Sequence, residues 1–273
     1  MGKFDGILIC TDLDGTLYRN DKTISEENRC AIEYFKREGG YFTFITGRLP
    51  YYSMDAYNLA RPNVPFGCIN GGGVYDGATD RYVWLCEISH DVVQLIACVD
   101  ARFKGIGIQL CCFDKTYFSE ENEMTEKFRK RTGLPNYICS YRDIKEPMGK
   151  IIFSSEDSDE LTAIEETVKA HPLADKFDFV RSERTLFEIL PKGVDKGLAL
   201  KKLAEYLKLD IGQTIAIGDF DNDVGMLKAA KLGVAVSNAS REALAAADAV
   251  TVSNEEHAIA DVIYGLESGK YRL

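Results

Sequence analysis

Long apolar runs are missing from this sequence, and no stretch approaches the roughly 20 residues needed to cross a bilayer. At the start of the chain only four consecutive apolar residues, Ile7–Cys10, come before the next charged residue. Such a run is too short for the apolar core of a secretion signal. We therefore expect no membrane partner and a cytoplasmic location.

Basic residues are fewer than acidic ones. The 273 residues include 33 Lys and Arg against 43 Asp and Glu, which gives a formal net charge of −10. A duplex nucleic-acid surface needs clustered basic residues to displace counterions, so this balance predicts no nucleic-acid partner. A local group of cations in a cleft can still bind a small anion, because close charges outweigh distant, screened ones.

Paired cysteines are also absent. The eight cysteines include no Cys-x-x-Cys pair, and most lie in apolar runs. We interpret them as small buried hydrophobic residues in a reducing compartment, and neither a disulfide framework nor a zinc site is expected. There is no internal repeat and no low-complexity segment. The 45% hydrophobic and 28% charged residues are typical of an ordinary globular protein.

Short apolar strands alternate with helical patterns at both ends of the chain. The predicted strands Ile7–Cys10, Tyr41–Ile45 and Phe66–Ile69 are separated by helices, the first opened by a capping box of Thr23 and Glu26. The same alternation returns after residue 195, with a strand at 214–217 between helices. Strands that alternate with helices need crossover connections, so these parts predict a parallel sheet.

The middle of the chain follows a different pattern. Here the predicted strands form hairpins, as from 107–112 into 116–118 and from 177–181 into 186–190. The sequence therefore predicts an α/β protein with a Rossmann-like parallel-sheet core and helices on both faces, made of residues 1–80 and 191–273. An α+β cap domain is inserted at 81–190.

Polar residues follow the first two predicted strands. Asp12 and Asp14 stand at the end of the first strand, directly before Gly15, and Thr46-Gly47-Arg48 ends the second. In open α/β sheets ligands bind at the carboxyl ends of the strands, and a hydroxyl beside a backbone nest can donate to phosphate. Taken singly, each motif also fits a plain turn.

Two further clusters lie in the last third of the chain. Lys196 stands at the start of a predicted helix, where the helix dipole disfavours a cation unless it faces an anion. Residues 218–223, Gly-Asp-Phe-Asp-Asn-Asp, gather hard oxygen ligands suited to Mg²⁺ and lack the calcium-loop pattern. A parallel sheet could bring all four clusters to one edge. They would supply a nucleophile, an acid/base, a cationic clamp and a metal, the ingredients of phosphoryl transfer.

These motifs resemble those of the haloacid dehalogenase-like superfamily, specifically its Cof-type phosphatases with a large cap inserted after the third core strand. The resemblance spans nearly the whole chain. It is carried by the segments DLDGT at 12–16, TGR at 46–48, NGG at 70–72, EILPKGVDKG at 188–197 and GDFDND at 218–223. The third replaces a more usual NGA, and Asp221 adds a carboxylate between the two acids expected within 219–223.

The resemblance implies a mechanism. Asp12 would attack the substrate phosphorus and become a phospho-aspartate, and Asp14 would protonate the leaving alcohol and then activate water, with Thr46 and Lys196 completing the catalytic set. The implied Mg²⁺ ligands are Asp12, Asp14 through its backbone carbonyl, Asp219, Asn222 and Asp223. The implied phosphate and substrate contacts are Asp12, Gly15, Thr46, Gly47, Arg48, Lys196 and Asn222.

The expected activity is that of a phosphoric monoester hydrolase acting on a small phosphate ester, with a sugar phosphate as the expected substrate class. Two alternatives stay open at this point. One is a phosphosugar mutase-like phosphotransferase that shares the aspartyl-phosphate step, and the other is a regulator that binds phosphate without turnover. The sequence does not name the metabolite, the specificity residues of the cap, or the oligomeric state, for which we expect a monomer or weak dimer.

Overall fold

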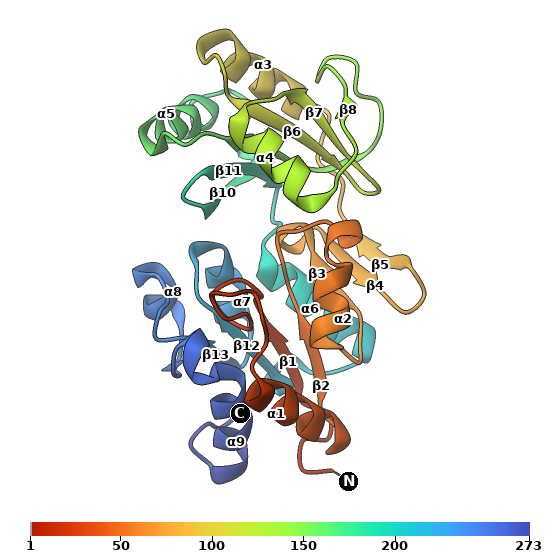
Figure 1. The fold of residues 1–273 in the computed structure, drawn as a ribbon, viewed down its shortest axis with the longest axis vertical. Helices are drawn as coiled ribbons and strands as arrows, with labels where there is room; N and C mark the ends of the chain where they lie inside the picture. The colour runs from red at the N-terminus through yellow and green to blue at the C-terminus, as the bar shows by residue number, and fades with distance from the viewer. Residues whose placement is uncertain (1) are drawn as a thin grey trace. The chain divides into compact units, whose positions relative to one another are not determined.

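A five-stranded parallel sheet organises the two ends of the chain in this computed structural model, which describes residues 2–273, with Arg131 described by its backbone alone. The strand order is β14-β13-β12-β1-β2, so β1 (Leu8–Thr11) lies between β2 (Tyr41–Phe44) and β12 (Thr214–Gly218). All five strands run parallel. Figure 1 shows these strands side by side, although they come from opposite ends of the sequence.

By its contacts the described chain divides into two compact units, one formed by residues 2–84 and 195–273 and the other by Leu85–Val194. The remaining elements of the first unit are α1 (Glu26–Arg37), α2 (Met54–Ala60), β3 (Phe66–Cys68), β4 (Gly73–Asp76), β5 (Arg81–Leu85, which ends at the boundary), α6 (Lys196–Leu207), α7 (Val224–Ala229), β13 (Leu232–Ala235), α8 (Arg241–Ala246), β14 (Ala249–Val250) and α9 (Ala258–Ser268). Short 3-10 turns lie at 50–52, 69–71, 211–213, 221–223 and 254–256.

Helices cover both faces of the parallel sheet. Successive strand residues point to opposite faces, and Leu8 and Cys10 pack in one apolar cluster with residues of α6 and α7. On the other side α1 packs against α9 and beside β2. All four residues of β1 are fully buried, as expected for the centre of a sheet covered on both sides. The predicted α/β fold class is therefore confirmed.

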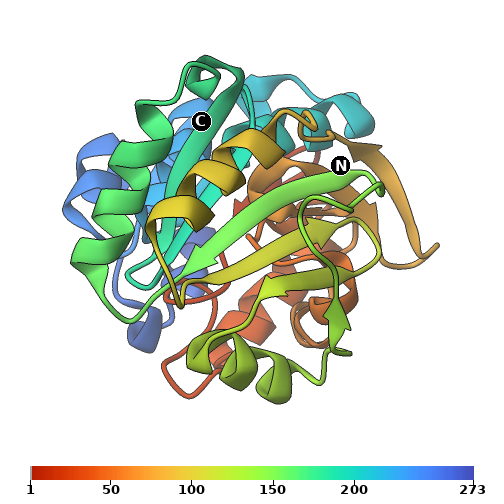
Figure 2. The same cartoon turned by 90° about the horizontal axis from the view of Figure 1, so that it is seen from above.

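The second unit is built on a six-stranded sheet of order β10-β11-β9-β6-β7-β8. Its elements are α3 (Val92–Arg102), β6 (Gly107–Cys112), β7 (Thr116–Glu120), α4 (Glu123–Thr132), β8 (Tyr137–Ile138), β9 (Met148–Ser154), α5 (Ser158–Lys169), β10 (Phe177–Glu183) and β11 (Leu186–Pro191), with a 3-10 turn at 174–176. The helices α3 and α5 lie against each other on one face, as Figure 2 shows. Apolar residues of both helices join the core of this sheet.

Several local predictions need correction. The strand β9 was missed, although it is a central strand that pairs with β6 and β11, because Lys150 interrupts its apolar run. Lys150 is buried and ion-paired with Glu188 of β11 at 2.7 Å, a partner that only the folded sheet supplies. The hairpin of β4 and β5 was also missed. The third predicted strand, β3, joins it in a separate three-stranded sheet and meets the parallel sheet only at a bridge from Gly67 to Ile45.

The predicted capping box at Thr23 and Glu26 is wrong. The first helix begins at Glu26, and its N-cap is Ser25, whose side chain accepts a hydrogen bond from Asn28 N. Thr23 donates instead to Asp21 at 2.6 Å and so belongs to the preceding loop. The boundaries predicted for the inserted domain, 81 and 190, each lie four residues before those of the compact second unit.

The turn after β3 places tight limits on Gly71. This residue has φ of +101°, and a Cβ there would overlap the backbone carbonyl oxygen of Asp195. We expect Gly71→Ala to lower the free energy of unfolding by about 2–4 kcal/mol, because it adds backbone strain to a clash with main chain. Urea unfolding measures this loss.

The matched control for that variant is Gly269→Ala in the same unit. Gly269 also has a positive φ, +79°, but a Cβ there meets nothing within 4 Å. Its substitution should cost only the backbone strain, about 1 kcal/mol. Equal losses in the two variants would contradict the close approach of Gly71 to Asp195.

Candidate active site

The central strand and its two neighbours place three polar side chains at one edge of the parallel sheet. Asp12 follows β1 directly, and its backbone N–H donates to Ile217 O at 2.8 Å, so it continues the register with β12. Asp219 follows the end of β12. On the other side Ile45 N donates to Thr11 O, and Thr46, buried, comes next. Parallel strands end at the same edge, which is why these residues meet.

Lys196 brings the start of α6 to the same edge. The helix is N-capped by Asp195, whose side chain accepts from Leu198 N at 2.8 Å. The Lys196 side chain is 1% exposed, and its ammonium donates to Asp12 Oδ1 and to Asp223 Oδ1. A cation at this helix start is therefore held by two buried carboxylates, which offset the unfavourable helix dipole.

The loop after β12 folds around Asp223. One carboxylate oxygen of Asp223 accepts hydrogen bonds from the N–H groups of Asp219 and Phe220, each at 3.0 Å. The side chain of Asp223 is fully buried. Gly218 lies against it so closely that a Cβ would come within 2.6 Å of the Asp223 Cβ. Glycine at 218 therefore lets the loop bring Asp223 back to the sheet edge.

Three carboxylates form a group that can hold a metal ion. Asp12, Asp219 and Asp223 each offer an oxygen, and these oxygens all lie within 4.8 Å of one another. Together with the Lys196 ammonium, three ionised carboxylates leave two negative charges uncompensated. A divalent cation would neutralise them, and the all-oxygen donor set is the kind that Mg²⁺ and Ca²⁺ prefer. The residues present fit the predicted metal.

Burial and crowding shift the pKa values of this group. Burial raises the pKa of Asp12 well above its usual range, which the Lys196 ammonium opposes and the neighbouring carboxylates reinforce. Burial, followed by the charge on Asp223, raises the pKa of Asp219 to about 6. Burial lowers the pKa of Lys196, but Asp12 and Asp223 outweigh it and hold the lysine charged. Without a cation, the carboxylates resist ionising together.

Asp14 lies in a second group, outside the three-carboxylate cluster. Its Oδ2 accepts from Arg48 at 2.6 Å and its Oδ1 from Lys22 at 2.8 Å. Burial on its own would raise the pKa of Asp14, but these two cations outweigh that effect and hold the pKa below its usual range. The predicted substrate contact Arg48 is therefore paired with the predicted acid/base in this structure.

Asn222 lies in a third group. Its side-chain amide donates to Asn70 Oδ1 at 3.1 Å, so its nitrogen is turned toward the turn after β3. Asn70 is 1% exposed, has φ of +51°, and its backbone N–H donates to Thr46 O. A Cβ on Gly47 would lie 2.9 Å from the Asn70 side chain, so glycine at 47 allows this contact. The carboxamide pair links the segment NGG at 70–72 to the loop at 218–223.

The backbone conformation and the close approach of Asp219 require glycine at position 15. It has φ of +81°, and a Cβ there would overlap the Asp219 carboxylate. Asn238 Nδ2 donates to its carbonyl oxygen at 2.9 Å. The following residue, Thr16, donates to Asp219 Oδ1 at 2.7 Å. Gly15 thus allows the first motif to approach Asp219 closely.

Asp221 is turned away from the three-carboxylate cluster. Its Oδ1 accepts from Ser240 Oγ at 2.7 Å, and Ser240 N–H donates to Asp219 O. The extra acid in the fourth motif therefore joins two loops. Sequence reasoning did not identify the roles of Thr16, Lys22, Asn70 and Asn238. Thr16 and Asn70 stood inside motifs already noted, whereas nothing near Lys22 or Asn238 marked them.

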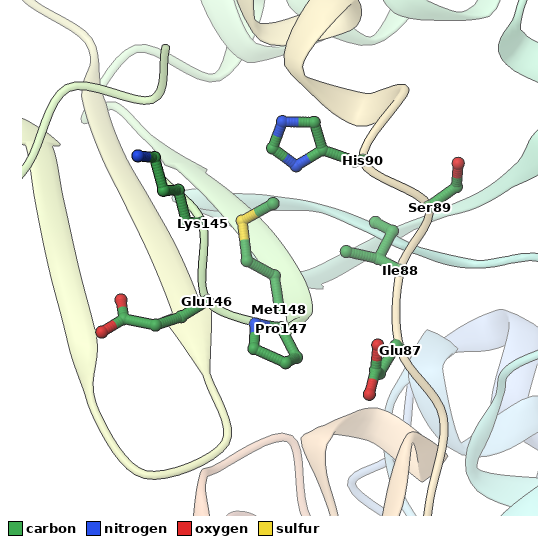
Figure 3. A pocket seen from close by; sticks show the side chains of 8 residues that line it. All are labelled: Glu87, Ile88, Ser89, His90, Lys145, Glu146, Pro147 and Met148. Carbon is green, nitrogen blue, oxygen red and sulfur yellow. The ribbon is translucent and has the colours of Figure 1, made fainter. Parts of the chain in front are cut away.

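A separate notch lies wholly within the second unit (Figure 3). It has a volume of about 430 Å³ and is lined by two segments, Glu87–His90 and Lys145–Met148. Ile88 N donates to Met148 O at 2.8 Å, which holds the two segments together. None of the motif residues lines it.

Comparison with known proteins decides the family. A family model described as haloacid dehalogenase-like hydrolase matches residues 9–263. The chain belongs to this family. The predicted family membership is thereby confirmed.

Relatives of this haloacid dehalogenase-like hydrolase are named as phosphatases. Two from Bacillus subtilis are called 5-amino-6-(5-phospho-D-ribitylamino)uracil phosphatases. One is 31% identical over 93% of this chain and 94% of its own, and the other 30% identical over 96% and 99%. A solved haloacid dehalogenase-like hydrolase of Bacteroides thetaiotaomicron is 27% identical, covers 94% of this chain and 98% of its own, and has a TM-score of 0.81. The predicted enzyme class, a phosphoric monoester hydrolase, fits these relatives.

Among the described residues, no helix is both long enough and apolar enough to pass through a lipid bilayer.

The raised pKa of Asp219 predicts a pH effect on stability. The folded protein binds this proton more tightly than the unfolded chain, so the carboxyl group stabilises the fold below about pH 4, and this contribution is lost as the pH rises through about 6. Asp219→Asn lacks that titration. In EDTA, its free energy of unfolding relative to the wild type should therefore rise by about 2 kcal/mol between pH 4 and pH 7. Urea unfolding at each pH measures the difference, and a difference independent of pH would contradict the crowding at this site.

Proposed function

We propose that this chain is a Mg²⁺-dependent phosphatase that hydrolyses a small phosphorylated metabolite, a sugar phosphate, through a phospho-aspartate on Asp12. One observation supports this proposal best. Lys196 donates to the Asp12 carboxylate, and two further carboxylates lie beside it, so a divalent cation would neutralise the two negative charges that remain. A nucleophilic aspartate needs both its partner cation and relief from neighbouring anions before it can approach a phosphate.

Asp12, Asp219 and Asp223 would hold the Mg²⁺, with the Asp14 backbone carbonyl and Asn222 as further proposed ligands. When bound, the ion would neutralise charge on the phosphate and on the cluster. Its contribution is large because two unit charges about 4 Å apart repel by about 4 kcal/mol at an effective dielectric constant of 20.

The residues of the chain divide the reaction between them. Lys196 holds one oxygen of Asp12, and Asp12 attacks the phosphorus while the bond to the leaving oxygen breaks. Thr46, the N–H groups around Gly15 and Gly47, Arg48 and Lys196 would bind the phosphate oxygens. The products of this first step are the acyl phosphate on Asp12 and the free alcohol, which needs one proton.

Asp14 would supply that proton and then take one from the water that hydrolyses the acyl phosphate. In this structure both its oxygens are engaged by Lys22 and Arg48, an arrangement suited to a carboxylate rather than a proton donor. Phosphate binding to Arg48 would loosen one of these pairs. Asp14 would thus gain its acid role only when substrate is bound.

A sugar phosphate is supported by the curated relatives. The two Bacillus subtilis proteins are named for a substrate that carries its phosphate on a ribityl chain, a linear sugar alcohol. We infer a leaving group of the same chemical kind for this chain: a primary alcohol of a polyol or sugar.

Asp12→Asn should reduce phosphate release from sugar phosphates by at least about three orders of magnitude, because the amide cannot form the acyl phosphate. Phosphate release over a panel of phosphorylated sugars, polyols, nucleotides and pyridoxal phosphate measures it. The matched control is Asp221→Asn, which removes a carboxylate from the same motif but one turned toward Ser240. The fold should survive in both variants. Wild-type-like hydrolysis by Asp12→Asn would refute the assigned nucleophile.

Removal of divalent ions with EDTA should abolish turnover, and millimolar Mg²⁺ should restore it. The ion should also raise the midpoint of thermal unfolding, because it binds the folded cluster alone. That rise should be smaller in Asp219→Asn and unchanged in Asp221→Asn. Turnover that persists in EDTA, after dialysis against chelator, would contradict the proposed metal dependence.

A further inference from the structure

Lys22 lies beside the acid/base carboxylate, although no motif includes it. Its ammonium donates to Asp14 Oδ1 at 2.8 Å, opposite the contact of Arg48 with Oδ2. The Lys22 side chain is 64% exposed, so water screens its ion pair with Asp14 and the pair contributes little to the stability of the fold. The loop that carries Lys22 is nevertheless held by several hydrogen bonds.

The loop at Arg19–Thr23 is held closed by its own backbone. Arg19 N donates to Thr23 O and Lys22 N donates to Arg19 O, each at 2.9 Å. Asp21 accepts from both the backbone N–H and the hydroxyl of Thr23. Lys22 occupies the left-handed region with φ of +65°, an uncommon conformation for lysine. This backbone persists because the surrounding hydrogen bonds determine it.

The loop is also fastened to the rest of its unit. Glu255 accepts from Arg19 Nε at 3.1 Å and from Asn20 N at 2.7 Å. The Asn254 side chain donates to Tyr18 O at 3.0 Å. The loop that carries Lys22 is therefore hydrogen-bonded both within itself and to residues 254 and 255, and it places the Lys22 ammonium against Asp14.

The position of Asp14 determines what Lys22 can reach. A leaving oxygen that takes a proton from Asp14 must come within about 3 Å of one of its carboxylate oxygens. Both oxygens are occupied in this structure, and the contact with Lys22 is the more exposed of the two. While Lys22 is paired with Asp14 at 2.8 Å, a leaving oxygen in contact with the same Asp14 oxygen lies at most about 6 Å from the ammonium. A hydroxyl oxygen on the carbon next to the phosphoester carbon, three bonds from the leaving oxygen, lies within that range.

The proposed leaving group supplies the acceptor. A primary alcohol of a polyol or sugar carries a hydroxyl group on the carbon next to the phosphoester carbon. The oxygen of such a hydroxyl group can accept a hydrogen bond from the Lys22 ammonium.

We propose that Lys22 is a specificity-determining residue that donates a hydrogen bond to a hydroxyl group of the leaving alcohol, on a carbon next to the phosphoester carbon. The proposal rests on the proposed phosphatase function and narrows its substrates to polyol and sugar phosphates with a vicinal hydroxyl. Lys22 exchanges Asp14 for this hydroxyl as the substrate binds.

The test compares two substrates that share a three-carbon chain. Glycerol 3-phosphate carries the vicinal hydroxyl, and n-propyl phosphate lacks it. Lys22→Met should lower kcat/KM for glycerol 3-phosphate about tenfold, mainly through KM, because a charge-assisted hydrogen bond is lost. Its kcat/KM for n-propyl phosphate should stay within about twofold of the wild type. Lys22→Arg, which keeps a donor, should recover most of the loss.

Lys208→Met is the matched control. Lys208 is also an exposed lysine in the left-handed region, with φ of +58°, and lies at the end of α6. The Lys208→Met variant should leave both kcat/KM values unchanged, and thermal unfolding should show that every variant is folded. Equal losses on both substrates in Lys22→Met would overturn the proposal, since Lys22 would then act only through Asp14.

No loss on either substrate in Lys22→Met would also overturn the proposal, as would a wild type that turns over neither. These results leave the phosphatase proposal standing as long as the wild type hydrolyses other phosphomonoesters. Absence of turnover over the whole panel would refute the phosphatase as well.

Discussion

The ammonium of Lys196 is the interaction on which the rest of the site depends. It is buried, and it connects the carboxylate that ends β1 with the carboxylate that closes the loop after β12. Removing one partner of such a buried pair typically costs about 3–5 kcal/mol, because a charge is left without compensation. With Lys196 charged, the three ionised carboxylates still leave the cluster with two uncompensated negative charges. A divalent cation would neutralise them.

The aspartates of the proposed active site lie in two different electrostatic environments. Burial and neighbouring carboxylates raise the pKa values of Asp12 and Asp219, whereas Arg48 and Lys22 lower the pKa of Asp14 despite its burial. Carboxyl groups whose environments separate their pKa values can take different roles in one reaction. The proposed roles need an ionised Asp12 and a protonated Asp14, so a cation bound at the three carboxylates and a phosphate bound to Arg48 would each have to shift these pKa values.

Close backbone approach is the second constraint. Gly15, Gly47 and Gly218 each stand where a Cβ would meet a side chain of the site: Asp219, Asn70 and Asp223 respectively. The glycines of the motifs therefore let loops from three strands converge within a few ångströms. The acidic residues alone would not assemble without them.

The sequence by itself determined the family, the parallel core and the four motifs, because alternating strands and helices, and acids placed directly after apolar strands, are local patterns. Only the tertiary structure decided which of those acids lie close enough together to share a metal ion and which do not. Asp221 looked equivalent to Asp219 and Asp223 in the sequence, yet its oxygen binds Ser240. The strand β9 was not predicted because Lys150 interrupts its apolar pattern, and the partner that neutralises Lys150, Glu188, is 38 residues away. Lys22 gave no signal although Asp14 is only eight residues away, because side-chain pairing is set by packing, which residue spacing does not record.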